Sequence, residues 1–479
     1  MALSAIDVFE WIKDNIVWGI PVIVLILTVG ILLTIRLKGL QVTHLGESLK
    51  YMVANESEGK GEVSSFAALC ISMAATLGTG KIVGVATAIA IGGPGALFWM
   101  IIAAIFGMAT KYAEGFLAIR FRRKQEDGTY IGGPFTYIED GMGKKWKWLA
   151  VCFAIFGSIC TIFGIGASTQ MSSIIKSFDS VFDPEMSNVI LTIDGHQVTL
   201  VAIIVGAVVT ILAAISIIGG IQRISKISVF LVPFMAIGYF LVCILILVFN
   251  ITKVPAAILE ICKSAFSFKS ATGGLAGMGI ILAMRQGISR GIFSNEAGLG
   301  SAPIALASAK SNDPVRQGLV CMSGTFIDTM VLCLTIGLGI VLTGSYIDNE
   351  DVNITINAFQ TGLHISQESS AVIVMLAIST FSFTTIIGWN VYGEKCICYL
   401  TNNNKKALVI YKIFYIVVVA LAPYFSLTLI WVIADICNGL MAIPNLIGLI
   451  ALSGLVAKET REYFINKKLQ KQVEEKEWQ

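Results

Sequence analysis

The sequence predicts an all-α polytopic membrane protein. Of its 479 residues, 56% are hydrophobic and only 14% are charged, and the mean hydropathy is +0.80. A soluble domain carries more charge and fewer apolar residues. The charges lie between apolar runs of about 20 residues, the length that crosses a bilayer as a helix. The net charge of +3 is small, so the composition does not indicate a nucleic-acid partner.

Eleven apolar segments are long enough to be membrane spans. In chain order they are 16–35, 66–91, 95–119, 148–177, 199–219, 227–249, 272–293, 316–343, 371–400, 407–422 and 425–456. The connections are short, so we expect all eleven to form one domain in the lipid bilayer. The first segment lacks a preceding basic region and is too long for the apolar part of a signal peptide, so we interpret it as a retained span.

The distribution of Lys and Arg between the spans predicts the orientation. The loops after spans three, five and nine carry Lys or Arg, whereas 179–198 and 344–370 carry neither. Loops with and without Lys or Arg alternate along the chain, as eleven spans require. This pattern predicts a protein of the cell (plasma) membrane with its N-terminus outside and its C-terminus in the cytoplasm. One loop disagrees with this orientation. The loop before span seven should lie outside, counting spans from the N-terminus, yet it carries Lys253, Lys263 and Lys269.

The spans divide into two sets of five. An extra N-terminal transmembrane helix (1–35) and a cytoplasmic linker (36–65) precede a first five-helix repeat at 66–249. The second repeat, at 256–456, is followed by a charged cytoplasmic tail at 457–479. Because five is odd, the two repeats have opposite orientations in the membrane.

Each repeat opens with an apolar segment that glycines interrupt. Gly78, Thr79 and Gly80 interrupt the first, and residues 273–279 (GGLAGMG) interrupt the second. A backbone can unwind within a membrane only against protein or a water-filled cavity. Interrupted helices at matching positions of inverted halves therefore indicate the binding site of a transporter.

Six long motifs extend over nearly the whole chain. They lie at 78–100 (GTGKIVGVATAIAIGGPGALFWM), 107–122, 132–143, 290–305 (RGIFSNEAGLGSAPIA), 388–396 and 434–449 (ADICNGLMAIPNLIGL). They resemble the signature motifs of the alanine/glycine:cation symporter family. The resemblance implies a leucine-transporter-like fold of 5+5 inverted repeats with one extra N-terminal transmembrane helix. It also implies sodium-coupled uptake of small neutral amino acids such as alanine or glycine, and in some members glutamine.

The first broken helix supplies candidate ligands for the carboxylate of an amino acid. Free N–H groups and the positive end of a helix dipole suit a carboxylate. In similar transporters these N–H groups lie where this chain has Thr79 and Gly80. Thr76 adds a hydroxyl group one turn earlier.

Four further residues are candidates for contact with the substrate. Gln170, in the membrane interior, is expected to bind either the ligand or a structural partner. Trp389 either caps the substrate pocket or packs against its neighbours. Gly277 and Met278, in the second interruption, would limit the pocket to a small side chain.

For sodium, similar transporters use main-chain carbonyls of the first repeat helix and hydroxyls of the eighth core helix. By alignment these are the carbonyls of Ala74 and Leu77 and the side chains of Thr384 and Thr385. The alternative is that the threonine hydroxyls bond back to the preceding turn of their own helix. Apart from the coupling ion, we expect no cofactor.

Lys81 departs from the family pattern, which has Asn at this position. In similar two-sodium transporters the residue here helps to hold a sodium ion, and an ammonium group cannot ligate a cation. The hypothesis is that one sodium site remains, with Lys81 in place of the missing charge or in contact with the substrate.

Other ionisable residues within the spans are functional candidates by default. Asp328 and Asp435 are candidates for coupling or gating, with a structural role as the alternative. Lys111 and Glu114, three residues apart on one helix, can neutralise each other. A further group comprises Arg285, Arg290 and Glu296. We expect these side chains near the cytoplasmic end of the second broken helix, either as a gate network or at the membrane interface.

The sequence excludes several other functions. A phosphate-binding loop would need Ser or Thr after Gly80-Lys81, but Ile82 follows, so we predict no nucleotide site and a secondary active transporter. No cluster of His, Cys or carboxylate residues at catalytic spacing indicates an enzyme. The remaining alternatives are a proton-coupled amino-acid symporter of the same fold, with Lys81, Asp328 or Asp435 titrating, and an amino-acid sensor that does not transport.

Overall fold

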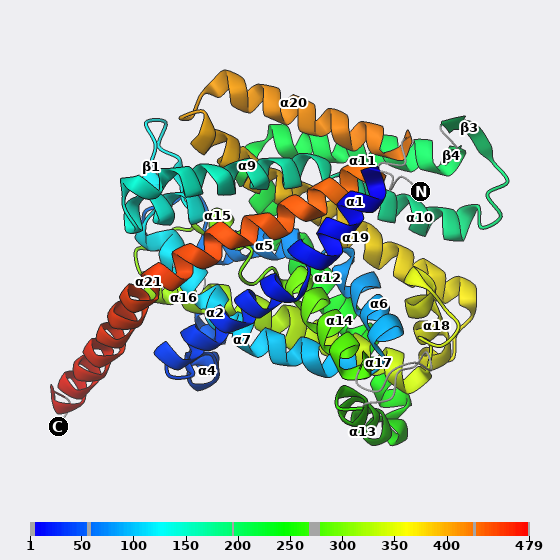
Figure 1. Ribbon diagram of the computed structural model, residues 1–479, viewed down its shortest axis with the longest axis horizontal. Helices are drawn as coiled ribbons and strands as arrows, with labels where there is room; N and C mark the ends of the chain where they lie inside the picture. The colour runs from blue at the N-terminus through cyan, green and yellow to red at the C-terminus, as the bar shows by residue number, and fades with distance from the viewer. Residues whose placement is uncertain (1–4, 55–58, 194–195, 268–277, 425–427, 478–479) are drawn as a thin grey trace.

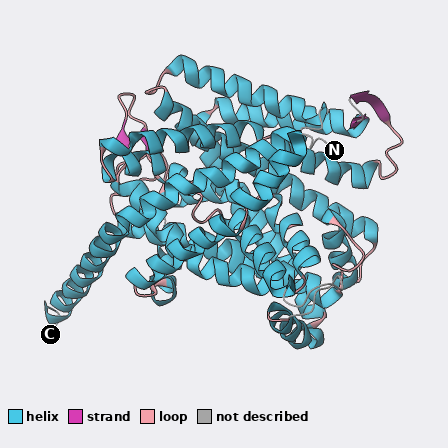
Figure 2. Cartoon of the chain, in the orientation of Figure 1, coloured by secondary structure: helices cyan, strands magenta, loops and turns pink. Residues whose placement is uncertain are grey.

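The computed structural model describes residues 5–54, 59–193, 196–267, 278–424 and 428–477. Helices make up most of this part (Figures 1 and 2). The helices of the first half are α1 (Ala5–Ile12), α2 (Ile20–Arg36), α3 (Leu40–Thr43), α4 (Leu45–Ala54), α5 (Ser65–Thr76), α6 (Val83–Gly92), α7 (Gly95–Arg120), α8 (Pro134–Thr136), α9 (Lys147–Phe163), α10 (Ser168–Phe182), α11 (Leu200–Ile218) and α12 (Gly220–Phe249). Those of the second half are α13 (Val254–Ala265), α14 (Met278–Asn295), α15 (Ala302–Leu306), α16 (Pro314–Thr325), α17 (Leu334–Thr343), α18 (Asp351–Leu363), α19 (Gln367–Leu400), α20 (Lys405–Leu421) and α21 (Thr428–Glu477).

Shorter elements connect these helices. The strands of the described residues form two antiparallel hairpins, β1 (Arg123–Lys124) with β2 (Tyr130–Ile131) and β3 (Val189–Ile193) with β4 (His196–Thr199). Two π-helical segments matter for the site, η1 (Lys13–Val17) and η6 (Phe326–Cys333). The 3-10 turn η2 (Thr79–Lys81) lies between α5 and α6.

Among the described residues, nine helices are long and apolar enough to cross a membrane, and ten if the bent pair α5–α6 counts as one span. The prediction of a mostly helical, multi-pass membrane protein is therefore confirmed. The seventh predicted span, 272–293, lies partly outside the described residues, and α14 begins at Met278. The count of eleven spans and the 5+5 repeat remain predictions.

The fourth predicted span, 148–177, is not one continuous helix. α9 ends at Phe163 and α10 begins at Ser168. A Cβ atom on Gly164 would lie 2.5 Å from the Cβ of Ala434, and one on Gly166 would lie 2.6 Å from the Cβ of Trp389. Glycine at these two positions lets the α9–α10 junction approach α21 and α19 closely, and the helix is interrupted at that contact.

The loops predicted on opposite sides of the membrane lie at opposite ends of the molecule. In Figure 1 the β1 hairpin and α4 lie towards the C-terminus, whereas β3–β4, α13 and α18 lie at the other end, as does the N-terminus. α13 carries Lys253 at its N-cap and Lys263 in its last turn. Lys253 and Lys263 thus lie at the same end as the β3–β4 hairpin, whereas Lys269 lies outside the described residues.

The linker and the tail pack against the bundle. The Ser48 hydroxyl of α4 donates a hydrogen bond of 2.7 Å to the carbonyl of Leu319 in α16. Lys467 of α21, within the predicted tail, lies 2.9 Å from the carboxylate of Glu47. α21 therefore continues the last predicted span into the tail as a single helix up to Glu477.

Candidate functional site

The helix formed by α5 and α6 is broken at the glycines that the sequence singles out. α5 ends at Thr76, η2 follows, and α6 begins at Val83. The two helices meet at an angle of 61°. A helix that ends in this way leaves the carbonyls of its last turn without partners of their own, so other groups must bind them.

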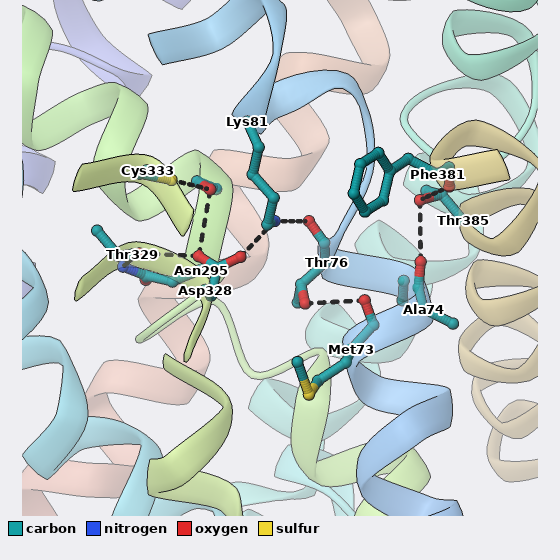
Figure 3. A network of polar contacts seen from close by, with 12 residues as sticks. Met73, Ala74, Thr76, Lys81, Asn295, Asp328, Thr329, Cys333, Phe381 and Thr385 are labelled. Carbon is teal, nitrogen blue, oxygen red and sulfur yellow. Dashed lines mark hydrogen bonds and ion pairs between the residues drawn. The ribbon is translucent and has the colours of Figure 1, made fainter. Parts of the chain in front are cut away.

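Two of these carbonyls are bound by side chains of α19. The hydroxyl of Thr385 lies 2.9 Å from the carbonyl of Ala74 (Figure 3), and the indole N–H of Trp389 donates to the carbonyl of Ala75 at 3.2 Å. The end of α5 is thus fixed to α19 beside the break. The Trp389 indole is used in this contact and is almost fully buried.

Polar atoms of two side chains lie directly against Gly78. A Cβ atom on Gly78 would lie 3.0 Å from Thr385 Oγ1 and 3.2 Å from both amide atoms of Gln170. Gln170 is buried, and its Oε1 atom has no hydrogen-bond partner among the described residues. An unpaired buried acceptor costs about 1–3 kcal/mol, and the ammonium group of a bound amino acid could satisfy it.

Lys81 joins the break to the second half of the chain. Its side chain is fully buried, and the ammonium group pairs with the carboxylate of Asp328 and donates to the carbonyl of Thr76 at 2.7 Å (Figure 3). The other carboxylate oxygen of Asp328 accepts hydrogen bonds from Thr329 at 2.8 Å and Ser294 at 3.2 Å. Asp328 lies on the π-helical segment η6, an irregularity often found at functional sites.

A small cavity adjoins this ion pair, with room for about one water molecule. Thr325 is buried beside it, and its hydroxyl has no hydrogen-bond partner among the described residues. The residues that line the cavity are Leu69, Ser72, Met73, Thr76, Lys111, Asn295, Cys321, Gly324, Thr325 and Asp328.

A second buried pair, Lys111 and Glu114, lies further along α7. Lys111 Nζ is 3.9 Å from Glu114 Oε2. Glu114 Oε1 accepts hydrogen bonds from the backbone N–H groups of Gly298 and Gly300, at 3.1 and 3.2 Å, and from the amide of Asn445 at 2.7 Å. Both glycines have positive φ, +88° and +79°, so the carboxylate holds a turn that suits glycine.

Two predicted hydroxyl ligands point elsewhere in this structure. The hydroxyl of Thr76 donates to the carbonyl of Met73 in its own helix at 3.2 Å. The hydroxyl of Thr384 donates to the carbonyl of Phe381 at 2.9 Å. Thr385 Oγ1 lies within reach of the same Phe381 carbonyl, at 3.0 Å, as well as of Ala74.

The other predicted ligands lie in or near the break. Leu77 forms the C-cap of α5, and Thr79 and Gly80 form part of η2. A Cβ atom on Gly80 would lie 3.7 Å from the ring of Phe293. Met278 begins α14, and Gly277 lies outside the described residues.

Arg285, Arg290 and Glu296, predicted near the cytoplasmic end as a gate network or as interfacial side chains, are separated. Arg285 and Arg290 line a cavity with Lys13 and Asp435, on the side of the molecule that holds the N-terminus, so their predicted position near the cytoplasmic end was wrong. Glu296 accepts a hydrogen bond from the hydroxyl of Ser301 instead.

The sequence alone did not identify several residues that contact the site, among them Phe293, Ser294 and Thr329. Phe293 and Ser294 belong to the motif RGIFSNEAGLGSAPIA, which was the available signal. Their contacts with Gly80 and Asp328 depend on how α14 packs against the break, and a single sequence does not contain that information.

Comparisons with known proteins agree on one family. Residues 3–477 match the model of the sodium:alanine symporter family. An uncharacterized transporter of Haemophilus influenzae is 44% identical over 462 residues, 96% of this chain and 95% of that protein. The sodium/alanine symporter AgcS of Methanococcus maripaludis is 41% identical over 461 residues (94% and 95%). The probable sodium/glutamine symporter GlnT of Bacillus subtilis is 37% identical over 459 residues (95% and 90%).

Proposed function

This chain belongs to the sodium:alanine symporter family, a family of transporters rather than enzymes, and from that premise we propose that it is a sodium-coupled symporter of small neutral amino acids. The resemblance read from the sequence motifs is thereby confirmed. Alanine and glycine are the first substrates to test. Glutamine is the next, since a relative 37% identical is named a probable sodium/glutamine symporter.

The observation that supports this proposal is the convergence of polar groups on the Gly78 break. The N–H groups of Thr79 and Gly80 would bind the substrate carboxylate, and the unpaired Oε1 of Gln170 would accept from its ammonium group. A neutral zwitterion suits such a pair of uncharged partners. A bulky side chain would meet the Phe293 ring next to Gly80, which favours a small substrate.

The proposed sodium site lies at the same break, at the end of α5, where Thr385 Oγ1 lies close to both Gly78 and the Ala74 carbonyl. The carbonyls of Ala74 and Leu77 and the hydroxyl of Thr385 would hold the ion, and Thr384 would join them only after its side chain rotates away from Phe381. One sodium ion crossing about 100 mV supplies roughly 2.3 kcal/mol, and a tenfold gradient adds about 1.4 kcal/mol. Together these support an accumulation of roughly a few hundredfold, through alternating access of the site to the two sides.

Lys81 supports a stoichiometry of one sodium ion per substrate. Its ammonium group is bound to a carbonyl of the broken helix and to the Asp328 carboxylate, which are oxygen ligands that an alkali cation would otherwise use. A measured coupling ratio of one sodium ion per amino acid is expected. A ratio of two would contradict this assignment.

The proposal is tested by uptake into proteoliposomes. Radiolabelled alanine, glycine and glutamine are supplied with an inward sodium gradient or with potassium in its place. Accumulation that needs the sodium gradient is expected for at least one of them. Binding without flux would indicate a sensor, and flux that is equal in potassium would overturn sodium coupling.

A second candidate is proton-coupled symport, which the buried Lys81–Asp328 pair favours as a place for a moving proton. It predicts uptake driven by a pH gradient in sodium-free buffer. The sodium proposal predicts no uptake there.

The proposed membrane is the plasma membrane, with the N-terminus outside and the C-terminus cytoplasmic. The loops 179–198 and 344–370, free of Lys and Arg, support this orientation. Lys145→Cys, made in a background of Cys152→Ser and Cys262→Ser because these two native cysteines are not buried, would test it. The new cysteine is expected to react with an impermeant thiol reagent only from the cytoplasmic side, and labelling of intact cells would contradict the orientation.

A further inference from the structure

A cavity lies between η1, α14 and α21, on the N-terminal side of the molecule. Its lining residues are Lys13, Trp18, Arg285, Gln286, Ser289, Arg290, Phe293 and Asp435. A second cavity shares Lys13, Arg290, Phe293 and Asp435 with the first and extends to Glu10, Gly164, Ile165, Thr169 and Val432. We call the two together the vestibule.

The vestibule borders the proposed substrate site. Phe293, in both lobes, lies 3.7 Å from the position of a Cβ atom on Gly80. Thr169 of the second lobe directly precedes Gln170. Trp18, from the extra N-terminal segment, packs edge-on against Phe293 at 6.4 Å between ring centroids. A solute that passes Phe293 from the vestibule therefore arrives at the break.

Arg290 is the feature of this vestibule that the proposed transport site does not explain. It lies one turn before Phe293 on α14 and is half-buried. Its guanidinium group has no hydrogen bond or ion pair with any of the residues that the structure describes. A charged side chain inside a membrane protein normally faces a partner or a pathway.

The charge of the vestibule favours an anionic group. The first lobe has three cationic side chains, Lys13, Arg285 and Arg290, and one carboxylate, Asp435. Glu10 adds a second carboxylate only in the other lobe. Of the cationic side chains, the guanidinium group has the planar, two-donor geometry that matches a carboxylate.

We propose that the vestibule is a second binding site for the amino-acid substrate, in which Arg290 binds its carboxylate before it passes Phe293. This inference rests on the proposed function, because it takes the ligand to be the transported zwitterion. The ligand class is an α-amino carboxylate, held by Arg290 with the polar side chains of Ser289 and Gln286 beside it.

A thiol-labelling experiment tests the site without measuring transport. Ser289→Cys is made in a background of Cys152→Ser and Cys262→Ser, since the other eight cysteines are buried. The purified protein is treated with an anionic (sulfonatoethyl) or a cationic (trimethylammonioethyl) methanethiosulfonate. Each rate is divided by the rate of the same reagent with a small free thiol. With Arg290 present, this normalised rate is expected to be about tenfold higher for the anionic reagent than for the cationic one, and Arg290→Gln should reduce the preference. Equal normalised rates in both backgrounds would overturn the assignment of an anion site.

Protection identifies the ligand. Alanine should slow labelling at Ser289→Cys, whereas alaninamide, which lacks the carboxylate, should not. Protection by alaninamide to the same extent would overturn the carboxylate assignment. If proteoliposomes show no uptake but the anionic preference holds, the proposed function fails and the anion site stands.

Uptake kinetics give an independent test. Arg290→Gln should raise the KM for alanine about tenfold, and Arg290→Lys should raise it less, since the charge remains but the two-donor geometry is lost. Lys145→Gln removes one exposed cationic charge far from the vestibule and should leave KM unchanged. An unchanged KM in Arg290→Gln, or an equal rise in Lys145→Gln, would overturn the proposal.

Discussion

Two buried lysine–carboxylate pairs lie within the same membrane bundle, and they differ in what else holds the carboxylate. In the Lys111–Glu114 pair, both residues are on α7 and the charged atoms are 3.9 Å apart. Two backbone N–H groups and the Asn445 amide also bind Glu114. In the Lys81–Asp328 pair, the residues come from different halves of the chain and are in direct contact.

This difference separates a structural pair from an exchangeable one. The backbone partners of Glu114 cannot leave without unfolding the turn at Gly298–Gly300. The hydroxyls of Ser294 and Thr329, which bind Asp328, can rotate to other acceptors. The ammonium group of Lys81 also binds the end of α5. We infer that the first pair maintains the fold, whereas the second can change its partners during transport.

The largest effect is expected for Glu114→Ala. It leaves Lys111 as an uncompensated buried charge and removes the acceptor of three hydrogen bonds, a loss of about 3–5 kcal/mol. The protein is purified in detergent and heated, and the folded fraction that remains is measured by size-exclusion chromatography. Much less folded protein is expected for Glu114→Ala than for the unsubstituted protein. Glu114→Gln, which retains an acceptor oxygen, should be less affected. Normal stability of Glu114→Ala would contradict a structural role.

The double variant Lys81→Met/Asp328→Asn tests the other pair. Removing both charges avoids leaving one of them unpaired, so stability should change little. Sodium-driven alanine uptake should fall about 100-fold, which is roughly 2.7 kcal/mol. If this variant unfolds like Glu114→Ala, the two pairs are both structural and the comparison fails.

The sequence was sufficient for features that depend on local composition. Apolar runs located ten of the expected spans, and the cluster Gly78–Gly80 located the break, because a lipid-facing helix has little use for three such residues together. Each of these features can be recognised within about 20 residues of sequence.

The features that were missed depend on contacts between distant segments. Gly164 and Gly166 interrupt a helix because Ala434 and Trp389 approach them. Lys81 and Asp328 each appeared as an isolated charge, because a single sequence does not show which faces of two helices meet. For the same reason the sequence could not distinguish Thr385, which reaches Ala74, from Thr384, which bonds to Phe381.

Substituting the two threonines separately extends the comparison to the sodium ligands. Thr385→Ala should raise the sodium concentration for half-maximal uptake about tenfold, since one ligand oxygen worth roughly 1.4 kcal/mol is lost. Thr384→Ala should raise it by less, because its hydroxyl bonds within its own helix. The double variant should lose sodium-dependent uptake while remaining folded. Unchanged sodium dependence in the double variant would contradict the proposed site.

The smallest effect is expected for Trp389→Phe, which removes one neutral hydrogen bond to the end of α5. The indole N–H bound to Ala75 is buried, and such a bond contributes about 1 kcal/mol. The aromatic packing is largely kept, so the melting temperature should fall by only a few degrees. If Trp389 only fixes the end of α5, the KM for alanine should change by less than about threefold, roughly 0.65 kcal/mol. A rise of tenfold or more without loss of stability would instead place Trp389 in contact with the substrate, as a cap on the pocket, and would make this end of α5 part of the binding site.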